Sequence, residues 1–183
     1  VEVYHSNGVE DDRYLYFKNH IWKSSHADWV IISDSDELIH VCDAMIAALE
    51  TERANIGKAS HVYHMIDEKD PASFFLLKKG VFDTSGHWDK TFLFKPRDYI
   101  DINYVPGAHT CFPMPRHNTS IRYTTYPILF LHYKFYLKTR FIFGHITRAS
   151  RLSSNNRKNG WGMQYLQPAE VYWREMVNRG ADV

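Results

Sequence analysis

Three acidic residues, Asp34, Asp36 and Glu37, follow directly after an apolar run at residues 29–33 that predicts a short buried strand. Because side chains two positions apart in a strand point the same way, we expect Asp34 and Asp36 to leave the sheet edge side by side. Two such carboxylates repel each other unless a cation lies between them, and their oxygens suit Mg²⁺ or Mn²⁺. The spacing therefore predicts a metal site that could hold a diphosphate, with a helix cap or a plain turn as the alternative.

Two histidines have the positions expected of further ligands. His132 follows the apolar run at residues 128–131, and strand ends carry the ligand sites of open α/β sheets, so we expect it to contact the metal or the diphosphate. His109 follows Gly107, in a loop that a ligand could approach closely. The alternative for each is a histidine that is only hydrogen-bonded or exposed at the surface.

Transfer of a group to a hydroxyl requires a general base when the reaction inverts the reacting carbon. The candidates for it are Asp89 and, in competition with it, Asp101 and His109. Asp89 could instead form a surface ion pair. The basic residues Lys90, Lys134, Arg148 and Arg151 could neutralise phosphate charge, with solvated surface charges as the alternative. The polar stretch 153–162 could close over a substrate as a lid, with Trp161 stacked on the donor or the acceptor. The alternative is a surface loop with Trp161 docked into the core.

These side chains need a sheet with flanking helices to bring them together. Residues 1–5 and 29–33 predict strands on either side of a helix at 11–23, which would make a β-α-β unit with a parallel strand pair. Further helices are predicted from residue 41 to near residues 55–57, at 141–151 and at 168–178. Further strands are predicted at residues 61–65, 74–77, 91–94, 101–104, 120–126 and 128–131.

Composition narrows the class of protein. A chain of 183 residues with 44% apolar and 23% charged residues predicts one globular domain. The net charge of +1 gives no reason to expect nucleic-acid binding. Two cysteines do not make a disulfide framework, so we expect a reducing, cytoplasmic location. No apolar run approaches the roughly 20 residues of a membrane span.

The motifs in order resemble those of the glycosyltransferases with the GT-A fold, and of the family 2-like transferases in particular. The strand that runs into Asp34, Asp36 and Glu37 resembles the Asp-x-Asp-Glu motif of that family. The remaining resemblance lies in the residues 88–91, 94–97, 107–109, 131–134 and 151–165.

The resemblance implies a Rossmann-related mixed sheet flanked by helices and a metal-dependent transfer from a nucleotide-sugar, by family habit a UDP-sugar with inversion, to a hydroxyl of an acceptor such as a glycan. It implies a β-α-β unit at 1–40, a central sheet and acceptor side at 41–135, and C-terminal helices with a possible lid at 136–183. GT-A domains usually have more sheet before the Asp-x-Asp motif. We therefore expect an N-terminally truncated domain, with further domains possible in a longer protein.

Two other functions fit parts of the pattern. Phosphatases of the haloacid dehalogenase class also place Asp-x-Asp after a strand, but they usually have Thr or Val where Leu38 stands here. A non-catalytic module that binds a nucleotide or a carbohydrate would need no general base. Release of phosphate from a phosphomonoester distinguishes the first alternative, and turnover of a nucleotide-sugar excludes the second.

Overall fold

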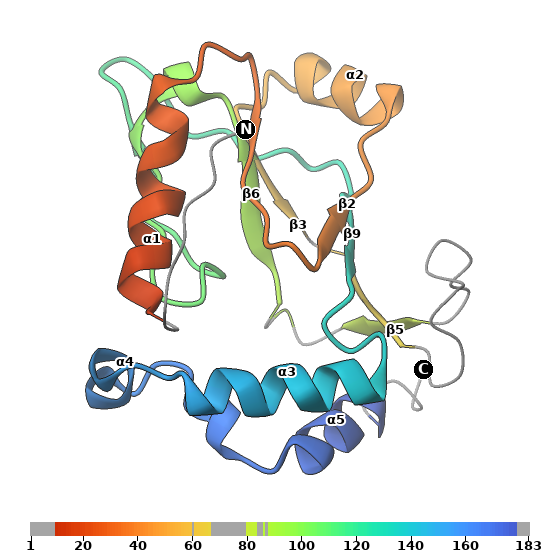
Figure 1. Cartoon of the computed structure of the whole chain (residues 1–183). Coiled ribbons are helices and arrows are strands. Elements are labelled where there is room, and N and C mark those ends of the chain that lie inside the picture. The colour runs from red at the N-terminus through yellow and green to blue at the C-terminus, as the bar shows by residue number, and fades with distance from the viewer. Residues whose placement is uncertain (1–9, 60, 67–79, 84–85, 87, 179–183) are drawn as a thin grey trace.

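The computed structural model describes residues 10–59, 61–66, 80–83, 86 and 88–178, and Figure 1 shows a mixed α/β arrangement of small sheets and helices. The α-helices are α1 (Asp11–His20), α2 (Asp43–Thr51), α3 (Lys138–Ser150), α4 (Ser154–Asn159) and α5 (Ala169–Asn178). Short 3₁₀ helices are η1 (Ile21–Ser24), η3 (Pro96–Asp98) and η4 (Met163–Leu166). The strands are β1 (Val30–Ile31), β2 (Glu37–Ile39), β3 (Ile56–Ala59), β4 (His61–Met65), β5 (Gly80–Asp83), β6 (Lys90–Phe94), β7 (Tyr99–Asp101), β8 (Met114–Pro115) and β9 (Leu129–His132).

Two small sheets form the centre of the molecule. The first has the strand order β1-β6-β3 and is antiparallel throughout. The second has the order β2-β9-β4-β5, in which β4 and β9 are parallel and the other neighbours antiparallel. A separate ladder pairs β7 with β8. The chain therefore passes from the first sheet to the second between β1 and β2, through the residues that include Asp34 and Asp36.

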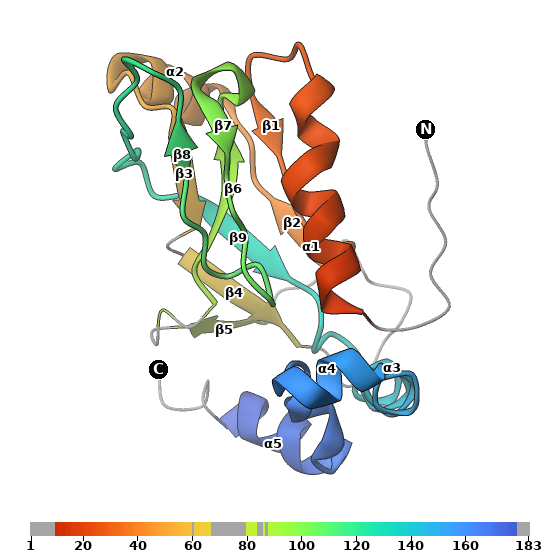
Figure 2. The ribbon, with the colours of Figure 1, turned by 90° about the vertical axis from the view of Figure 1, so that its left-hand side faces the viewer.

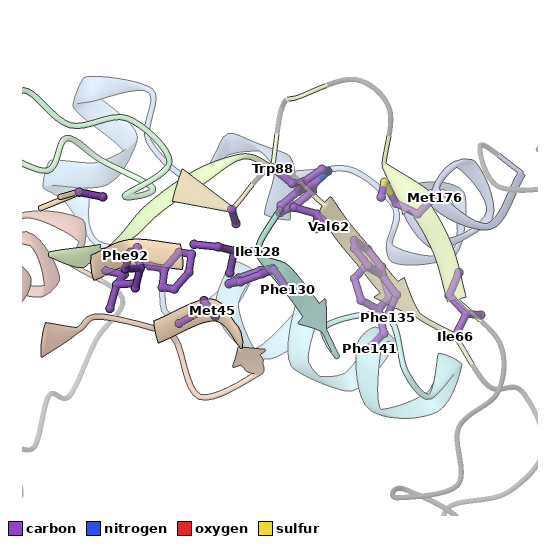
Figure 3. Packing of buried hydrophobic residues seen from close by; sticks show 14 of the residues in the cluster. Met45, Val62, Ile66, Trp88, Phe92, Ile128, Phe130, Phe135, Phe141 and Met176 are labelled. Atoms are coloured by element: carbon purple, nitrogen blue, oxygen red, sulfur yellow. The ribbon is translucent and has the colours of Figure 1, made fainter. Parts of the chain in front are cut away.

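The larger hydrophobic core runs from β6 to the C-terminal helices. All five residues of β6 are buried, because the strand lies between two neighbours in its sheet. Figure 3 shows Phe92 of β6, Phe130 of β9, Phe135 of the β9–α3 connection and Phe141 of α3 along this buried cluster. Full burial of one such side chain stabilises a fold by roughly 1.5–3 kcal/mol. The core therefore joins both sheets to α3.

A smaller core fixes the C-terminal end of α1. Trp22 of η1 is buried and packs edge-on against Phe94, with 4.9 Å between the ring centroids. The side chain of Asn19 accepts a hydrogen bond from the backbone N–H of Tyr104 at 2.8 Å and donates to its carbonyl at 3.2 Å. These contacts hold α1 at a fixed position beside the first sheet (Figure 2).

The helices α3, α4 and α5 gather at one end of the sheets, at the bottom of both Figure 1 and Figure 2. Phe141 of α3 and Trp173 and Met176 of α5 are buried in the larger core. The side chain of the buried Asn156 in α4 accepts a hydrogen bond from the backbone N–H of Asp11 at 3.1 Å. The start of α1 is therefore tied to the C-terminal helices.

The predicted α/β class is confirmed, and several elements lie where the sequence predicts them. The predicted helices correspond to α1 with η1, to α2, to α3 and to α5. The strands predicted at residues 61–65, 91–94 and 128–131 correspond to β4, β6 and β9. In the part of the chain that the structure describes, no helix is long and apolar enough to cross a membrane.

Other predictions differ from the structure. The strands predicted at residues 1–5 and 74–77 lie outside the described residues, and so does the predicted parallel pair. Only Val30–Ile31 is a strand within 29–33, and it pairs antiparallel with β6. Residues 120–126 make one isolated bridge, between Tyr123 and Ile56, and no regular strand. The strand predicted at residues 101–104 is instead β7, Tyr99–Asp101.

The polar stretch 153–160 was predicted as a loop, and it is largely the helix α4. The hydroxyl of Ser153 accepts a hydrogen bond from the backbone N–H of Asn156 and so caps the start of the helix. Gly160 ends the helix with a φ of 71°, a left-handed conformation that glycine adopts readily. Both residues are ordinary helix-end signals that the polar composition of the stretch obscured.

Candidate functional site

A cavity of about 680 Å³ lies between α1, the β1–β2 connection and the C-terminal helices. Its volume is within the range of about 300–1,000 Å³ that is usual for sites of small molecules. Acidic, basic and aromatic side chains share its walls, and we call it the central cavity. The residues that matter for its chemistry are Lys18, Asp34, Asp36, Glu37, Trp88, His109, His132, Lys134, Arg148, Tyr165 and Tyr172.

The acidic residues enter the central cavity from a turn that joins the two sheets. The backbone N–H of Glu37 donates to the carbonyl of Asp34 at 3.1 Å, which closes the turn. The backbone N–H of Tyr133 donates to the carbonyl of Asp36 at 2.7 Å and fixes the turn to the end of β9. The expectation of an extended chain through Asp34 and Asp36 is therefore wrong, although both residues line the same cavity.

Asp34 is held between two lysines. Lys18 of α1 donates to one carboxylate oxygen at 2.5 Å, and Lys90 of β6 donates to the other at 3.0 Å. Burial alone would raise the pKa of Asp34, but the charges of Lys90 and Lys18 outweigh it and hold that pKa well below its usual value of 3.8. Asp34 is therefore ionised at neutral pH and already has two cationic partners.

Lys90 is buried beneath the central cavity. Its ammonium contacts both carboxylate oxygens of Glu37 at 2.8 Å in addition to Asp34. Burial lowers the pKa of Lys90, but the charges of Asp34 and Glu37 reverse this effect and raise the pKa. Lys90 is not among the residues that line the cavity. Lys90 therefore positions the acidic turn and does not have the position predicted for a contact with phosphate.

The carboxylate of Asp36 is the acidic group that remains available to a ligand. Asp36 lines the central cavity, and among the described residues no basic side chain forms an ion pair with it. A half-buried carboxylate at the cavity wall fits a hard divalent cation. Asp34 fits less well, because a cation would have to displace the two lysines.

A cation at Asp36 would need more ligands than the protein supplies in one cluster. Within the described part of the chain, no group of three or more His, Cys, Asp or Glu side chains could hold a metal ion. Magnesium commonly keeps bound waters and takes oxygens from a substrate phosphate. The donor set therefore fits a cation that binds with its substrate, with Asp36 as the protein ligand.

Two of the predicted histidines flank a buried tryptophan. The ring centroid of Trp88 lies 5.1 Å from that of His132 and 5.3 Å from that of His109. His132 is buried, and its Nδ1 lies 3.1 Å from Nδ1 of His64. Burial, His64 and Lys134 hold the pKa of His132 well below its usual value of 6.5, so this imidazole is neutral near pH 7. Only its Nε2 therefore remains to face a ligand.

The structure brings together several of the predicted site residues, because Asp34, Asp36, His109 and His132 all line the central cavity. Asp89 does not line it, and its carboxylate pairs instead with Lys58 at 3.1 Å. Asp89 therefore forms the ion pair that was the alternative to a role as general base.

Arg151 and Trp161 also lie away from the cavity walls, although both were predicted to contact the substrate. Arg151 is exposed just beyond the end of α3, and Trp161 follows α4. Tyr165, four residues further along, lines the cavity in place of Trp161.

The cavity is also lined by Lys18, Tyr165 and Tyr172, for which the sequence predicted no role. The helical spacing of α1 and the aromatic content of the C-terminal region were visible in the sequence. Which face each helix turns to the cavity depends on tertiary packing, which periodicity does not reveal.

Comparison of the chain with models of known protein families, with curated proteins and with solved structures finds no match.

Proposed function

We propose that this chain is a glycosyltransferase domain with a GT-A-like fold, which moves a sugar from a nucleotide-sugar to a hydroxyl of an acceptor such as a glycan. One observation carries the proposal. The Asp-x-Asp turn, both candidate histidines and the basic residues Lys134 and Arg148 line a single cavity that is large enough for a nucleotide-sugar. UDP is the expected nucleotide, and inversion the expected outcome, by the family resemblance alone.

In this proposal each residue has a separate task. A divalent cation, Mn²⁺ or Mg²⁺, neutralises the leaving diphosphate when it is bound, and Asp36 would hold it. His132 is neutral, and its Nε2 can accept or donate a hydrogen bond beside that position. His109 is the candidate base for the acceptor hydroxyl, because it lines the cavity and Asp89 does not.

The test is the thermal unfolding midpoint with Mn²⁺ and UDP, with Mn²⁺ alone, with UDP alone and with EDTA. A ligand that binds only the folded chain raises the midpoint by mass action, so we expect a rise that requires metal and nucleotide together. Asp36→Asn should abolish this rise. Asp28→Asn is the matched control, because Asp28 is highly exposed and lies in a surface ion pair with Arg97.

Turnover decides between the transferase and its alternatives. Release of UDP from a UDP-sugar in the presence of an acceptor supports the transferase, whereas binding without release supports a non-catalytic module. A phosphatase of the haloacid dehalogenase class would need a free oxygen on Asp34 for attack, and both of its oxygens accept hydrogen bonds from lysines. Hydrolysis of a phosphomonoester by this chain would nevertheless favour the phosphatase and overturn the proposal.

A further inference from the structure

Two basic side chains enter the central cavity from the part of the chain that follows β9. Lys134 follows β9, Arg148 lies in α3, and both line the cavity. The ammonium of Lys134 is surrounded by aromatic rings. Its nitrogen lies 5.3–5.7 Å from the ring centroids of Trp88, Tyr165, Phe135 and Tyr172. Cation–π attraction of this kind holds a lysine in place without neutralising its charge.

Arg148 reaches the same group of rings from α3. Its guanidinium carbon lies 5.8 Å from the ring centroid of Tyr165, which Lys134 also contacts. Its side chain passes over Gly144, where a Cβ atom would lie 3.3 Å from Nη1 of Arg148. The absence of a side chain at Gly144 leaves room for this path. Lys134 and Arg148 therefore share one aromatic surface.

The carboxylates of Asp36 and Asp34 attract Lys134 from a distance, without forming an ion pair with it. Among the described residues no carboxylate forms an ion pair with either Lys134 or Arg148. Burial and the charge of Arg148 lower the pKa of Lys134 to about 8, so the ammonium is still mostly protonated at neutral pH. Two like charges in a partly desolvated wall are unfavourable unless an anion lies between them.

Two lysines beside the acidic turn, Lys18 in the cavity wall and Lys90 beneath it, show that this arrangement is specific. Lys18 and Lys90 are paired with Asp34 and Glu37 at 2.5–3.0 Å, so the protein neutralises these cations internally. An anionic ligand gains little from a lysine that already has a carboxylate partner. Lys134 and Arg148 are therefore the cations of the cavity that can act on a ligand.

We propose that Lys134 and Arg148 form a subsite for a phosphate group and that this subsite holds the group without a divalent cation. A phosphate carries up to two negative charges and several acceptor oxygens, so one group can satisfy both side chains. The guanidinium can donate two parallel hydrogen bonds, and the ammonium acts as a point charge.

This subsite deepens the proposed function and rests on it for the source of the phosphate. The phosphate belongs either to the diphosphate of the donor or to a phosphorylated acceptor. The same chemistry serves both sources, and the experiment separates them.

The experiment is calorimetric titration with pyrophosphate in EDTA at neutral pH. We expect binding to the wild-type chain, and a loss of affinity of about tenfold or more in Lys134→Met and in Arg148→Gln. The matched controls are Lys158→Met in α4 and Arg140→Gln in α3, which remove exposed cations outside the cavity. Both controls should keep the wild-type affinity within about twofold.

Lys134→Arg and Arg148→Lys keep the charge and should retain part of the affinity, which separates a lost charge from a lost fold. Circular dichroism and the unfolding midpoint check the fold of each variant. Absence of pyrophosphate binding in the wild type, or equal affinity in the wild type and both charge-removing variants, overturns the subsite.

Titrations with UDP and with a sugar phosphate, both in EDTA, assign the source. A parallel loss of UDP affinity in Lys134→Met and Arg148→Gln assigns the subsite to the donor. Unchanged UDP affinity with a loss of sugar-phosphate affinity assigns it to the acceptor. Because these titrations need neither metal nor turnover, the subsite can hold even if Asp36→Asn leaves the response to Mn²⁺ and UDP unchanged and the transferase proposal fails.

Discussion

The ammonium of Lys90 lies 2.8 Å from both carboxylate oxygens of Glu37, and neither side chain is more than 3% exposed. Lys90 belongs to the first sheet and Glu37 begins a strand of the second. The buried ion pair therefore joins the two sheets at the point where the acidic turn enters the cavity.

Replacement of Lys90 by methionine should strongly destabilise the fold. It leaves the carboxylate of Glu37 buried without a counter-charge, which costs roughly 3–5 kcal/mol of unfolding free energy. Arg97→Met is the control, because Arg97 and Asp28 form a pair that is 64% and 81% exposed. Such a surface pair contributes about 1 kcal/mol or less. Urea denaturation compares the two variants, and equal losses would contradict a structural role for the buried pair.

Removal of Lys18 should strengthen the binding of Mn²⁺ in the presence of UDP. The ammonium of Lys18 occupies one oxygen of Asp34 and repels any other cation nearby. Its loss in Lys18→Met should therefore tighten Mn²⁺ binding by about tenfold. Titration calorimetry measures the change. Lys23→Met serves as the control, because Lys23 pairs with Asp101 outside the cavity. Weaker binding in Lys18→Met would mean that Lys18 contacts the ligand directly.

The buried charge of Lys134 should be visible in the pH dependence of stability. Burial and Arg148 lower its pKa from the usual 10.5 to about 8 in the folded chain. Between these two values the unfolded chain holds a proton that the folded chain has released, so stability rises with pH in this interval. The unfolding free energy of the wild type should therefore rise relative to that of Lys134→Met from pH 8 to pH 10. Parallel curves in urea denaturation would show that the lysine is not perturbed.

Two glycines near α4 offer a matched test of the aromatic wall. Gly160 and Gly162 have φ values of 71° and 70°, so alanine at either position costs about 1–2 kcal/mol of backbone strain. A Cβ atom at Gly162 would lie 3.0 Å from Leu152 and 3.3 Å from Tyr165, whereas one at Gly160 meets nothing within 4 Å.

Gly162→Ala should therefore displace Tyr165 and weaken pyrophosphate binding, and Gly160→Ala should affect stability alone. The affinities of both variants come from the same calorimetric titration. If both variants bind pyrophosphate like the wild type, Tyr165 does not help to position the cationic pair.

The elements that the sequence predicted are those whose signal is local. β9 is an apolar run of β-forming residues, and α2, α3 and α5 repeat their apolar residues at helical spacing. Each such pattern depends on residues that are close together in the sequence, so the packing of distant segments does not alter it. The apolar run of β9 also predicts that His132 lies at the end of the strand. Since strand ends carry ligand sites, the sequence predicts a site residue there.

The charge pattern of the site was not predictable in the same way. Asp34 contacts Lys18, 16 residues before it, and Lys90, 56 residues after it. Such contacts depend on how the two sheets and α1 pack, and no spacing in the sequence encodes them. Among the described residues lysines form ion pairs with Asp34 and not with Asp36, a difference that the spacing of the two carboxylates does not predict.

The walls of the central cavity come from distant parts of the chain, with carboxylates at residues 34–37 and the cationic and aromatic wall at residues 134–172. A ribosome completes the acidic turn long before it makes the C-terminal helices. A nascent chain that ends near residue 130 therefore carries the Asp-x-Asp turn without its partner surface. Binding competence should consequently arise only after the residues through Tyr172 have been made, and ribosome-bound chains of increasing length would reveal when the pocket first captures a ligand.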